Sequence, residues 1–294
     1  MRWTIALSTP FDWQGVLDYL ALRAIPGVEH VDDARYRRTV SLGAHRGWLE
    51  VSRHGRTLQV RCEGLPKGSQ AEVTRRVGLL FDTEFRPRVL RDCFGSDEIL
   101  GAVLAKYPGV RVPGCWDGFE LTVRTVAGQQ VSVRGASTVV GRIGARFGTV
   151  GPELPDGLTH WFPTPEQFMV APAAELGMPV SRGLAMLEVA RSVHNGTLSF
   201  EPGVTAASDI VAWMKGFTGI KGIGPWTASY VAMRALGYRD AMPAGDLALQ
   251  RAACLDPTGR LDAKELEARA EAWRPWRAYA AALLWKRYGE MQQQ

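Results

Sequence analysis

The stretch Gly219–Tyr230 reads G-I-K-G-I-G-P-W-T-A-S-Y and joins one helical pattern to a second helix that Pro225 can begin. Gly222 and Gly224 predict backbone conformations closed to other residues, and they leave no side chain between the backbone N–H groups and an approaching anion. Proline suits the first helical position, and the positive end of the helix also favours an anion. The stretch is therefore a candidate phosphate-binding turn, to which Lys221 adds a positive charge.

These glycines are compatible with two other interpretations. Ordinary connections between helices also need glycine, and the turn considered alone favours that interpretation. A nucleotide-binding loop fits poorly, because the order is G-x-x-G-x-G rather than G-x-G-x-x-G and no G-K-S/T follows. The turn alone therefore leaves a structural role open.

Asp246, in P-A-G-D-L-A-L-Q-R, is a candidate acid or base that lies a short distance after the second helix. A carboxylate can stabilise a developing positive charge and can orient or activate water. The same residue in the same context is also typical of a helix N-cap. One carboxylate can serve both purposes, so the sequence leaves the two interpretations side by side.

Composition limits the other chemistries. The formal net charge is +5 with a pI near 9.2, which permits a polyanionic partner without requiring one. The four cysteines and five histidines show no paired spacing, so no metal site is predicted and the thiols are expected to be reduced in a cytosolic protein. No stretch is long and apolar enough to predict a membrane span, and a cytoplasmic protein is expected.

The pattern of elements changes along the chain. Residues 2–7, 36–42, 47–53 and 57–62 have strand character, with turn signals at Leu42–Ala44 and His54–Gly55. Residues 14–24 and 70–81 repeat apolar side chains at helical spacing. Beyond about residue 88 almost every segment is predicted to be helical, and residues 148–164 are predicted to form a loop. We therefore expect an α+β fold, with an antiparallel sheet first and helices after it.

The hairpin motif resembles the helix-hairpin-helix of the DNA glycosylase superfamily, and P-A-G-D matches the family's downstream catalytic aspartate. Further stretches are similar to the alkylated-base branch of that superfamily, the AlkA-type DNA-3-methyladenine glycosylases II, and together they cover essentially the whole chain. These stretches are Phe11-Asp12-Trp13, Leu80-Phe81-Asp82, Val112-Pro113-Gly114-Cys115, G-Q-Q-V-S-V at 128–133 and W-R-P-W-R at 273–277.

The resemblance implies a domain organisation. A TATA-binding-protein-like sheet domain would occupy residues 1–90. One helical domain would combine residues 91–115 with 238–294 and contribute the catalytic aspartate and C-terminal aromatic residues. A second helical domain, residues 116–237, would carry the helix-hairpin-helix.

The resemblance also implies an activity and a catalytic set. The activity is removal of alkylated purines such as 3-methyladenine from double-stranded DNA, with Asp246 as the catalytic residue. The superfamily members that form a covalent intermediate with the sugar have a lysine two residues after the last hairpin glycine, where this chain has Trp226. Because tryptophan is no amine nucleophile, a reaction that uses water is expected. The base would be flipped into an aromatic pocket. The residues that match this pocket are Tyr19, Trp226, Tyr230 and Trp276.

DNA contacts are implied as well, at Lys221, Gly222, Ile223 and Gly224 of the hairpin and at Gln130. Gln130 stands where the family commonly has an apolar wedge, and a glutamine can still fill the stack and hydrogen-bond the orphaned base. Tyr19 departs from the phenylalanine frequent in the family and adds a hydroxyl. No cofactor is expected beyond a monovalent cation that backbone carbonyls of the hairpin can hold.

The expected partner is alkylated duplex DNA, with no membrane and a monomeric protein. A first rival function is a glycosylase of the same fold that acts on deaminated or oxidised bases. A second is a protein that binds damaged DNA without catalysis. Asp246 and the aromatic set argue against the second rival.

Overall fold

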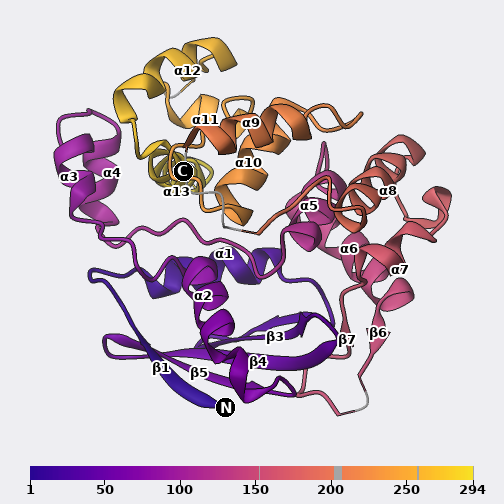
Figure 1. The fold of residues 1–294 in the computed structure, drawn as a ribbon. Helices are drawn as coiled ribbons and strands as arrows, with labels where there is room; N and C mark the ends of the chain where they lie inside the picture. Colours follow the sequence, from indigo (N-terminus) through magenta and orange to yellow (C-terminus); the bar gives the residue numbers. More distant parts are fainter. Residues whose placement is uncertain (152, 202–206, 257, 294) are drawn as a thin grey trace.

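The computed structural model describes residues 1–151, 153–201, 207–256 and 258–293. Residues 152, 202–206, 257 and 294, which the predicted ranges include, lie outside this description. The architecture is α+β, as predicted, with an antiparallel sheet near the N-terminus and helices through the rest of the chain (Figure 1).

The sheet has five strands in the order β1-β5-β4-β3-β2, and every neighbouring pair is antiparallel. Gly43 stands in the hairpin turn between β3 and β4 with φ of +57°, and Gly55 stands in the turn between β4 and β5 with φ of +56°. Both turns were predicted, and glycine adopts this conformation without a steric cost. The short β2 was not predicted. The strands are β1 (Arg2–Ala6), β2 (Glu29–Val31), β3 (Arg35–Leu42), β4 (His45–His54) and β5 (Thr57–Glu63).

Two helices, α1 (Trp13–Arg23) and α2 (Gln70–Phe81), lie between this sheet and the rest of the chain (Figure 1). Both were predicted from their apolar spacing, to within one residue at each end. Their inward side chains share one core with alternate residues of the strands. This core includes Val16, Leu17, Leu20, Leu49, Val51, Leu58, Val60, Val73, Val77 and Leu80.

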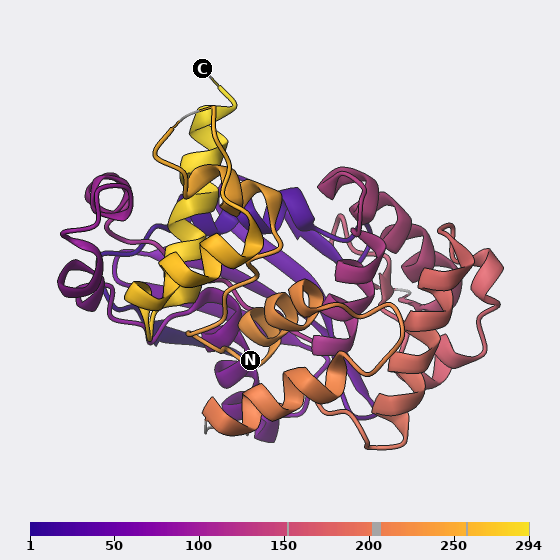
Figure 2. The same cartoon turned by 90° about the horizontal axis from the view of Figure 1, so that it is seen from above.

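A second core joins two parts of the chain that are far apart in sequence. In both views α3 (Val89–Phe94) and α4 (Leu100–Lys106) lie close to the C-terminal helix α13 (Arg277–Met291), and α4 packs against α13 (Figures 1 and 2). The same core holds residues of α11 (Leu247–Ala252), of α12 (Ala263–Ala270) and of the short 3₁₀ turn Glu271–Trp273. This packing holds the segment that begins with Asp246 against the end of the chain.

A third core forms among the central helices. Its helices are α5 (Gly118–Ala127), α6 (Val133–Phe147), α7 (Pro165–Met169), α8 (Val180–His194), α9 (Ala207–Phe217) and α10 (Pro225–Ala235). Ala232 and Met233 of α10 belong to the second core, whereas Tyr230 and Val231 belong to the third. Since α10 is shared, the division into residues 1–90, 91–115 with 238–294, and 116–237 stays a prediction.

Residues 148–164, predicted to be a loop, contain a small two-stranded ribbon, and this part of the prediction is wrong. Strands β6 (Thr149–Val150) and β7 (His160–Trp161) pair antiparallel. Strands of two residues give no alternating pattern that a sequence could reveal. Among the described residues, no helix has the length and apolar character needed to cross a membrane.

Candidate functional site

The hairpin forms as the sequence predicts, although its two glycines differ. Helix α9 ends at Phe217, and α10 begins at Pro225 with Gly224 as its N-cap residue. Gly222 has φ of +97°, and a Cβ there would lie 3.0 Å from Cβ of Ala185. Gly224 is extended, with φ of −92° and ψ of 173°, and a Cβ built there has no atom within 4 Å. The prediction of a special conformation is therefore wrong for Gly224, where only the lack of a side chain distinguishes glycine.

The side chains of the turn separate into exposed and buried groups. Lys221 and Gly222 are exposed, whereas Ile223 is 4% exposed and packs into the third core. Ile223 therefore anchors the turn through its side chain and can offer a partner only its backbone. The outward surface of the hairpin consists of backbone groups and the Lys221 ammonium.

Gln130 lies in the turn between α5 and α6, where it is exposed and has φ of +58°. Its Oε1 accepts a hydrogen bond from Arg182 at 3.4 Å. The neighbouring Gln129 was not predicted to matter, yet its Nε2 donates to Gly222 O at 3.1 Å and to Thr227 Oγ1 at 3.3 Å. Gln129 thus ties the turn that carries Gln130 to the hairpin.

Asp246 is the N-cap of α11 and also faces an aromatic ring. Its Oδ1 accepts from the backbone N–H groups of Ala248 at 2.9 Å and of Leu249 at 3.1 Å. Its Oδ2 accepts from Nε1 of Trp226 at 3.3 Å. The two interpretations that the sequence left open are compatible, because the cap uses one oxygen and leaves the other turned toward α10.

The aromatic residues on α10 lie side by side next to Asp246. Trp226 and Tyr230 are four residues apart, which places them on one helix face, and their rings stack at 5.4 Å with 13° between the planes. The hydroxyl of Tyr230 lies 3.0 Å from that of Tyr19 on α1. The structure therefore brings together Asp246, Trp226, Tyr230 and Tyr19.

Among the described residues, the aromatic contacts of Trp276 are with other rings, so its predicted place in the base pocket stays a prediction. Its ring lies beside Phe85 at 5.4 Å and Tyr279 at 6.0 Å in the second core. Trp285, nine residues later on α13, packs instead against Tyr230, with ring centroids 6.1 Å apart in a T-shaped arrangement. Trp285 could not be predicted as part of the site, because a single tryptophan within a helix carries no local sign of its neighbours.

Three arginines, Arg23, Arg124 and Arg234, lie near the two tyrosine hydroxyls. None of them was predicted from the sequence to belong to the site. The guanidinium of Arg234 lies 4.5 Å from the Tyr19 ring centre and 5.4 Å from that of Tyr230, and Arg23 lies 4.2 Å from the Tyr19 ring centre. Burial raises the pKa of Tyr19 to about 12. Burial also acts to raise the pKa of Tyr230, but the charges of Arg234, Arg23 and Arg124 outweigh it and lower that pKa to about 7.

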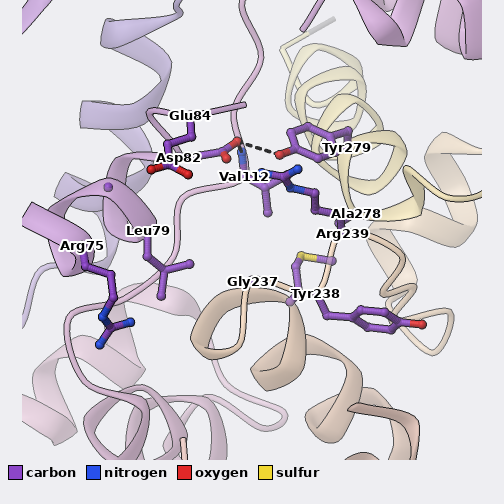
Figure 3. A pocket seen from close by; sticks show the side chains of 12 residues that line it. Arg75, Leu79, Asp82, Glu84, Val112, Gly237, Tyr238, Arg239, Ala278 and Tyr279 are labelled. Carbon is purple, nitrogen blue, oxygen red and sulfur yellow. Dashed lines mark hydrogen bonds between the residues drawn. The ribbon is translucent and has the colours of Figure 1, made fainter. Parts of the chain in front are cut away.

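A separate pocket of about 210 Å³ lies where α2 faces Gly237–Arg239 and the start of α13 (Figure 3). Asp82 borders it and accepts hydrogen bonds from Val112 N at 3.2 Å and from Tyr279 Oη at 2.9 Å. Burial raises the pKa of Asp82 to about 6. None of the residues grouped around Asp246 lines this pocket, so the two sites are distinct.

Comparisons with known proteins cover nearly the whole chain. The AlkA N-terminal domain family matches residues 3–117. "DNA-3-methyladenine glycosylase 2" of Escherichia coli (strain K12) is 33% identical over 291 residues, which are 96% of each chain. "Probable bifunctional transcriptional activator/DNA repair enzyme AlkA" of Mycobacterium tuberculosis (strain ATCC 25618 / H37Rv) is 35% identical over 289 residues. This alignment covers 96% of the present chain but 56% of that longer protein. The "3-methyladenine dna-glycosylase from Archaeoglobus fulgidus" superposes with a TM-score of 0.84 over 98% of both chains, at 22% identity, and shows the same fold.

Proposed function

The chain belongs to the family of AlkA-type DNA-3-methyladenine glycosylases, and from this premise we propose that it excises alkylated purines from double-stranded DNA. An N-alkylated purine carries a formal positive charge and leaves readily as a neutral base. Breaking its N-glycosidic bond leaves a sugar with oxocarbenium character, to which water then adds. The protein is a hydrolase that acts on this bond.

The observation that carries the proposal is the position of the Asp246 carboxylate beside the stacked rings of Trp226 and Tyr230. Oδ1 is held by two backbone N–H groups, which fixes the orientation of the carboxylate, and Oδ2 is 3.3 Å from Trp226 Nε1. A base lodged against the rings of Trp226 and Tyr230 would place its sugar near this oxygen. Asp246 would then stabilise the oxocarbenium charge and accept the proton of the attacking water.

Water is the expected nucleophile because the position after Pro225 is Trp226, whose indole cannot form a Schiff base. The nearest lysine in sequence, Lys221, lies on the exposed surface of the hairpin. The reaction would release the base and leave an abasic strand uncut.

DNA would be held through its backbone by the exposed N–H groups of the hairpin and by Lys221, while Gln130 would occupy the gap left by the flipped base. A monovalent cation, if bound, would need carbonyl oxygens of the same turn. Ile220 O accepts from Ile223 N, and Gly222 O accepts from Gln129 Nε2, so each keeps a second lone pair for an ion. The cation that the resemblance implies would be held through these two oxygens.

A panel of lesion duplexes tests the proposed function. Methylated DNA should release 3-methyladenine faster than DNA with deaminated or oxidised bases releases those bases. Faster release of a deaminated or oxidised base would assign the protein to another lesion class. Binding to every duplex without release of any base would support the non-catalytic alternative. A covalent complex trapped with borohydride would refute the water-using reaction.

A further inference from the structure

Arg234 is a buried cation without a carboxylate partner. It is 2% exposed, and in the described part of the chain its guanidinium donates to Pro113 O at 2.7 Å, forms no ion pair, and leaves Nε without a hydrogen bond. Arg38 is equally buried but lies 2.6 Å from a Glu120 carboxylate oxygen and 3.7 Å from one of Glu29. An isolated charge is costly in a buried site. Since Arg38 has carboxylate partners and Arg234 has none among the described residues, we expect another counter-ion near Arg234.

The groups that face Arg234 are aromatic rings, two of which carry hydroxyls. Its guanidinium lies 4.5 Å from the ring centre of Tyr19 and 5.4 Å from those of Tyr230 and Trp285. Tyr230 precedes Arg234 by one helical turn, and its hydroxyl is 3.0 Å from that of Tyr19. In this cluster the two tyrosines are the groups that can become anions.

The other charged groups around the two hydroxyls come from several elements. Arg23 on α1 lies over the Tyr19 ring, and Arg124 on α5 donates through Nε to Arg23 O at 3.0 Å. Both add positive charge at Tyr230. Three acidic residues lie in this neighbourhood. The oxygens of Asp246, before α11, are engaged by the N-cap and by Trp226. Glu29 and Glu120 line a cavity together with Tyr19, Arg23 and Arg124, and both are paired with Arg38. The local excess of positive charge therefore remains to be balanced.

We propose that Tyr230 is the counter-ion of Arg234, a phenolate that accepts a hydrogen bond from Tyr19 and makes the pocket select cationic alkylated purines over neutral bases. The inference rests on the proposed function, since it assigns a substrate preference to the same site. The phenolic proton passes to solvent, and no other reactant is needed. The direction of the hydrogen bond follows from burial, which raises the pKa of Tyr19 and keeps that hydroxyl protonated as the donor.

The proposed phenolate would distinguish substrates by charge. An alkylated purine carries its positive charge until the glycosidic bond breaks. The phenolate cancels one positive charge of the arginine cluster, so it lowers the repulsion that a cationic base meets where the dielectric constant is low. A neutral purine can stack on the same rings but gains nothing from this change of charge. Because the pKa of Tyr230 lies at about 7, the preference should appear as pH rises through neutrality.

Tyr230→Phe and Tyr19→Phe test the proposal, with Tyr288→Phe as a matched control, since Tyr288 lies on α13 at the edge of the second core. Each change removes one hydroxyl and leaves a ring in place. In wild-type protein, near-ultraviolet absorbance should show one tyrosine titrating near pH 7. The titration should vanish in Tyr230→Phe, move to higher pH in Tyr19→Phe, and persist in Tyr288→Phe.

Single-turnover release of 3-methyladenine from methylated DNA supplies the second readout, with a duplex containing neutral hypoxanthine as the comparison. A group with a pKa of about 7 changes its ionised fraction about tenfold between about pH 6 and about pH 8. The rate for 3-methyladenine relative to hypoxanthine should rise by up to about tenfold over this interval in wild-type protein and stay flat in Tyr230→Phe.

Two results would overturn the proposal: no tyrosine that titrates near neutrality, or equal pH dependence of the rates in wild-type protein and Tyr230→Phe. A wild-type protein that releases neither base would instead refute the proposed function. The absorbance titration would still decide whether Tyr230 ionises, so the two failures are distinguishable.

Discussion

Asp246→Asn removes the negative charge of one side chain while keeping its shape. Asparagine Oδ1 can accept the hydrogen bonds from Ala248 N and Leu249 N that cap α11. Asn and Asp are about equally good N-cap residues, so the free energy of unfolding should change little. Asp246→Ala removes the cap as well and should cost about 0.5–2 kcal/mol of stability. Comparison of the two variants separates the structural role from the chemical one.

The expected loss of rate follows from the position of Oδ2. If this oxygen faces the sugar, its charge stabilises the oxocarbenium ion, and removal of one such preorganised electrostatic contact typically slows a reaction about 10²–10³-fold. That factor corresponds to about 3–4 kcal/mol of transition-state stabilisation. Asp246→Asn should therefore lose at least this much rate while unfolding at nearly the wild-type temperature.

The assay is single-turnover release of 3-methyladenine at saturating enzyme, with thermal unfolding of the same preparations. Release at the native rate by Asp246→Asn would refute the catalytic role. A rate loss that appears only in Asp246→Ala, together with a lower unfolding temperature, would show that Asp246 acts only as a cap.

Three further predictions concern the hairpin, the pocket beside α2 and the aromatic set. Gly222→Ala should lower stability by about 1 kcal/mol or more because φ there is +97°, whereas Gly224→Ala should leave thermal unfolding unchanged and weaken DNA binding, measured by titration of a labelled duplex. Burial raises the pKa of Asp82 to about 6, so the folded state holds this proton more tightly and stability falls as pH rises from about 4 to about 6. At about pH 8, Asp82→Asn should therefore increase the free energy of unfolding by at most about 3 kcal/mol and raise the unfolding temperature. Near pH 4 the variant and the wild-type protein should unfold at the same temperature. An equal effect at the two pH values would contradict the raised pKa of Asp82. Trp285→Ala should slow base release more than Trp276→Ala in the single-turnover assay, because Trp285 contacts Tyr230, whereas the aromatic contacts of Trp276 are with Phe85 and Tyr279. The reverse order would show that the base lies nearer to Trp276.

The sheet could be predicted because its patterns are local. Alternating burial along β5 and glycine at the tips of the β3–β4 and β4–β5 hairpins follow from the strand period and from turn geometry. Strand β2 escaped prediction because its three residues are all half-buried and show no alternation. The two-residue strands β6 and β7 are too short for any period.

The site could be predicted where a motif carried it and not where tertiary packing assembled it. The hairpin, Asp246 and the α10 aromatic residues are close in sequence, and the structure places them together. Trp276 and Trp285 both belong to the C-terminal segment, and only the packing of α13 against α10 shows which of them lies beside Tyr230. The roles of the site residues, the monomeric state and the cation at the hairpin stay predictions.

The buried arginines could not be predicted, because nothing local distinguishes Arg234 from an arginine on a helix surface. Its environment comes from Tyr19, more than two hundred residues earlier, and from Trp285 on another helix. The charge around Tyr19 and Tyr230 is therefore a property of the fold.

Chromatographic analysis of methylated duplex DNA incubated with the wild-type protein tests the central claim most directly. The expected result is free 3-methyladenine in the soluble fraction and an abasic strand that stays uncut until alkali is added. Bound but unchanged DNA, with no free base above spontaneous loss, would contradict it.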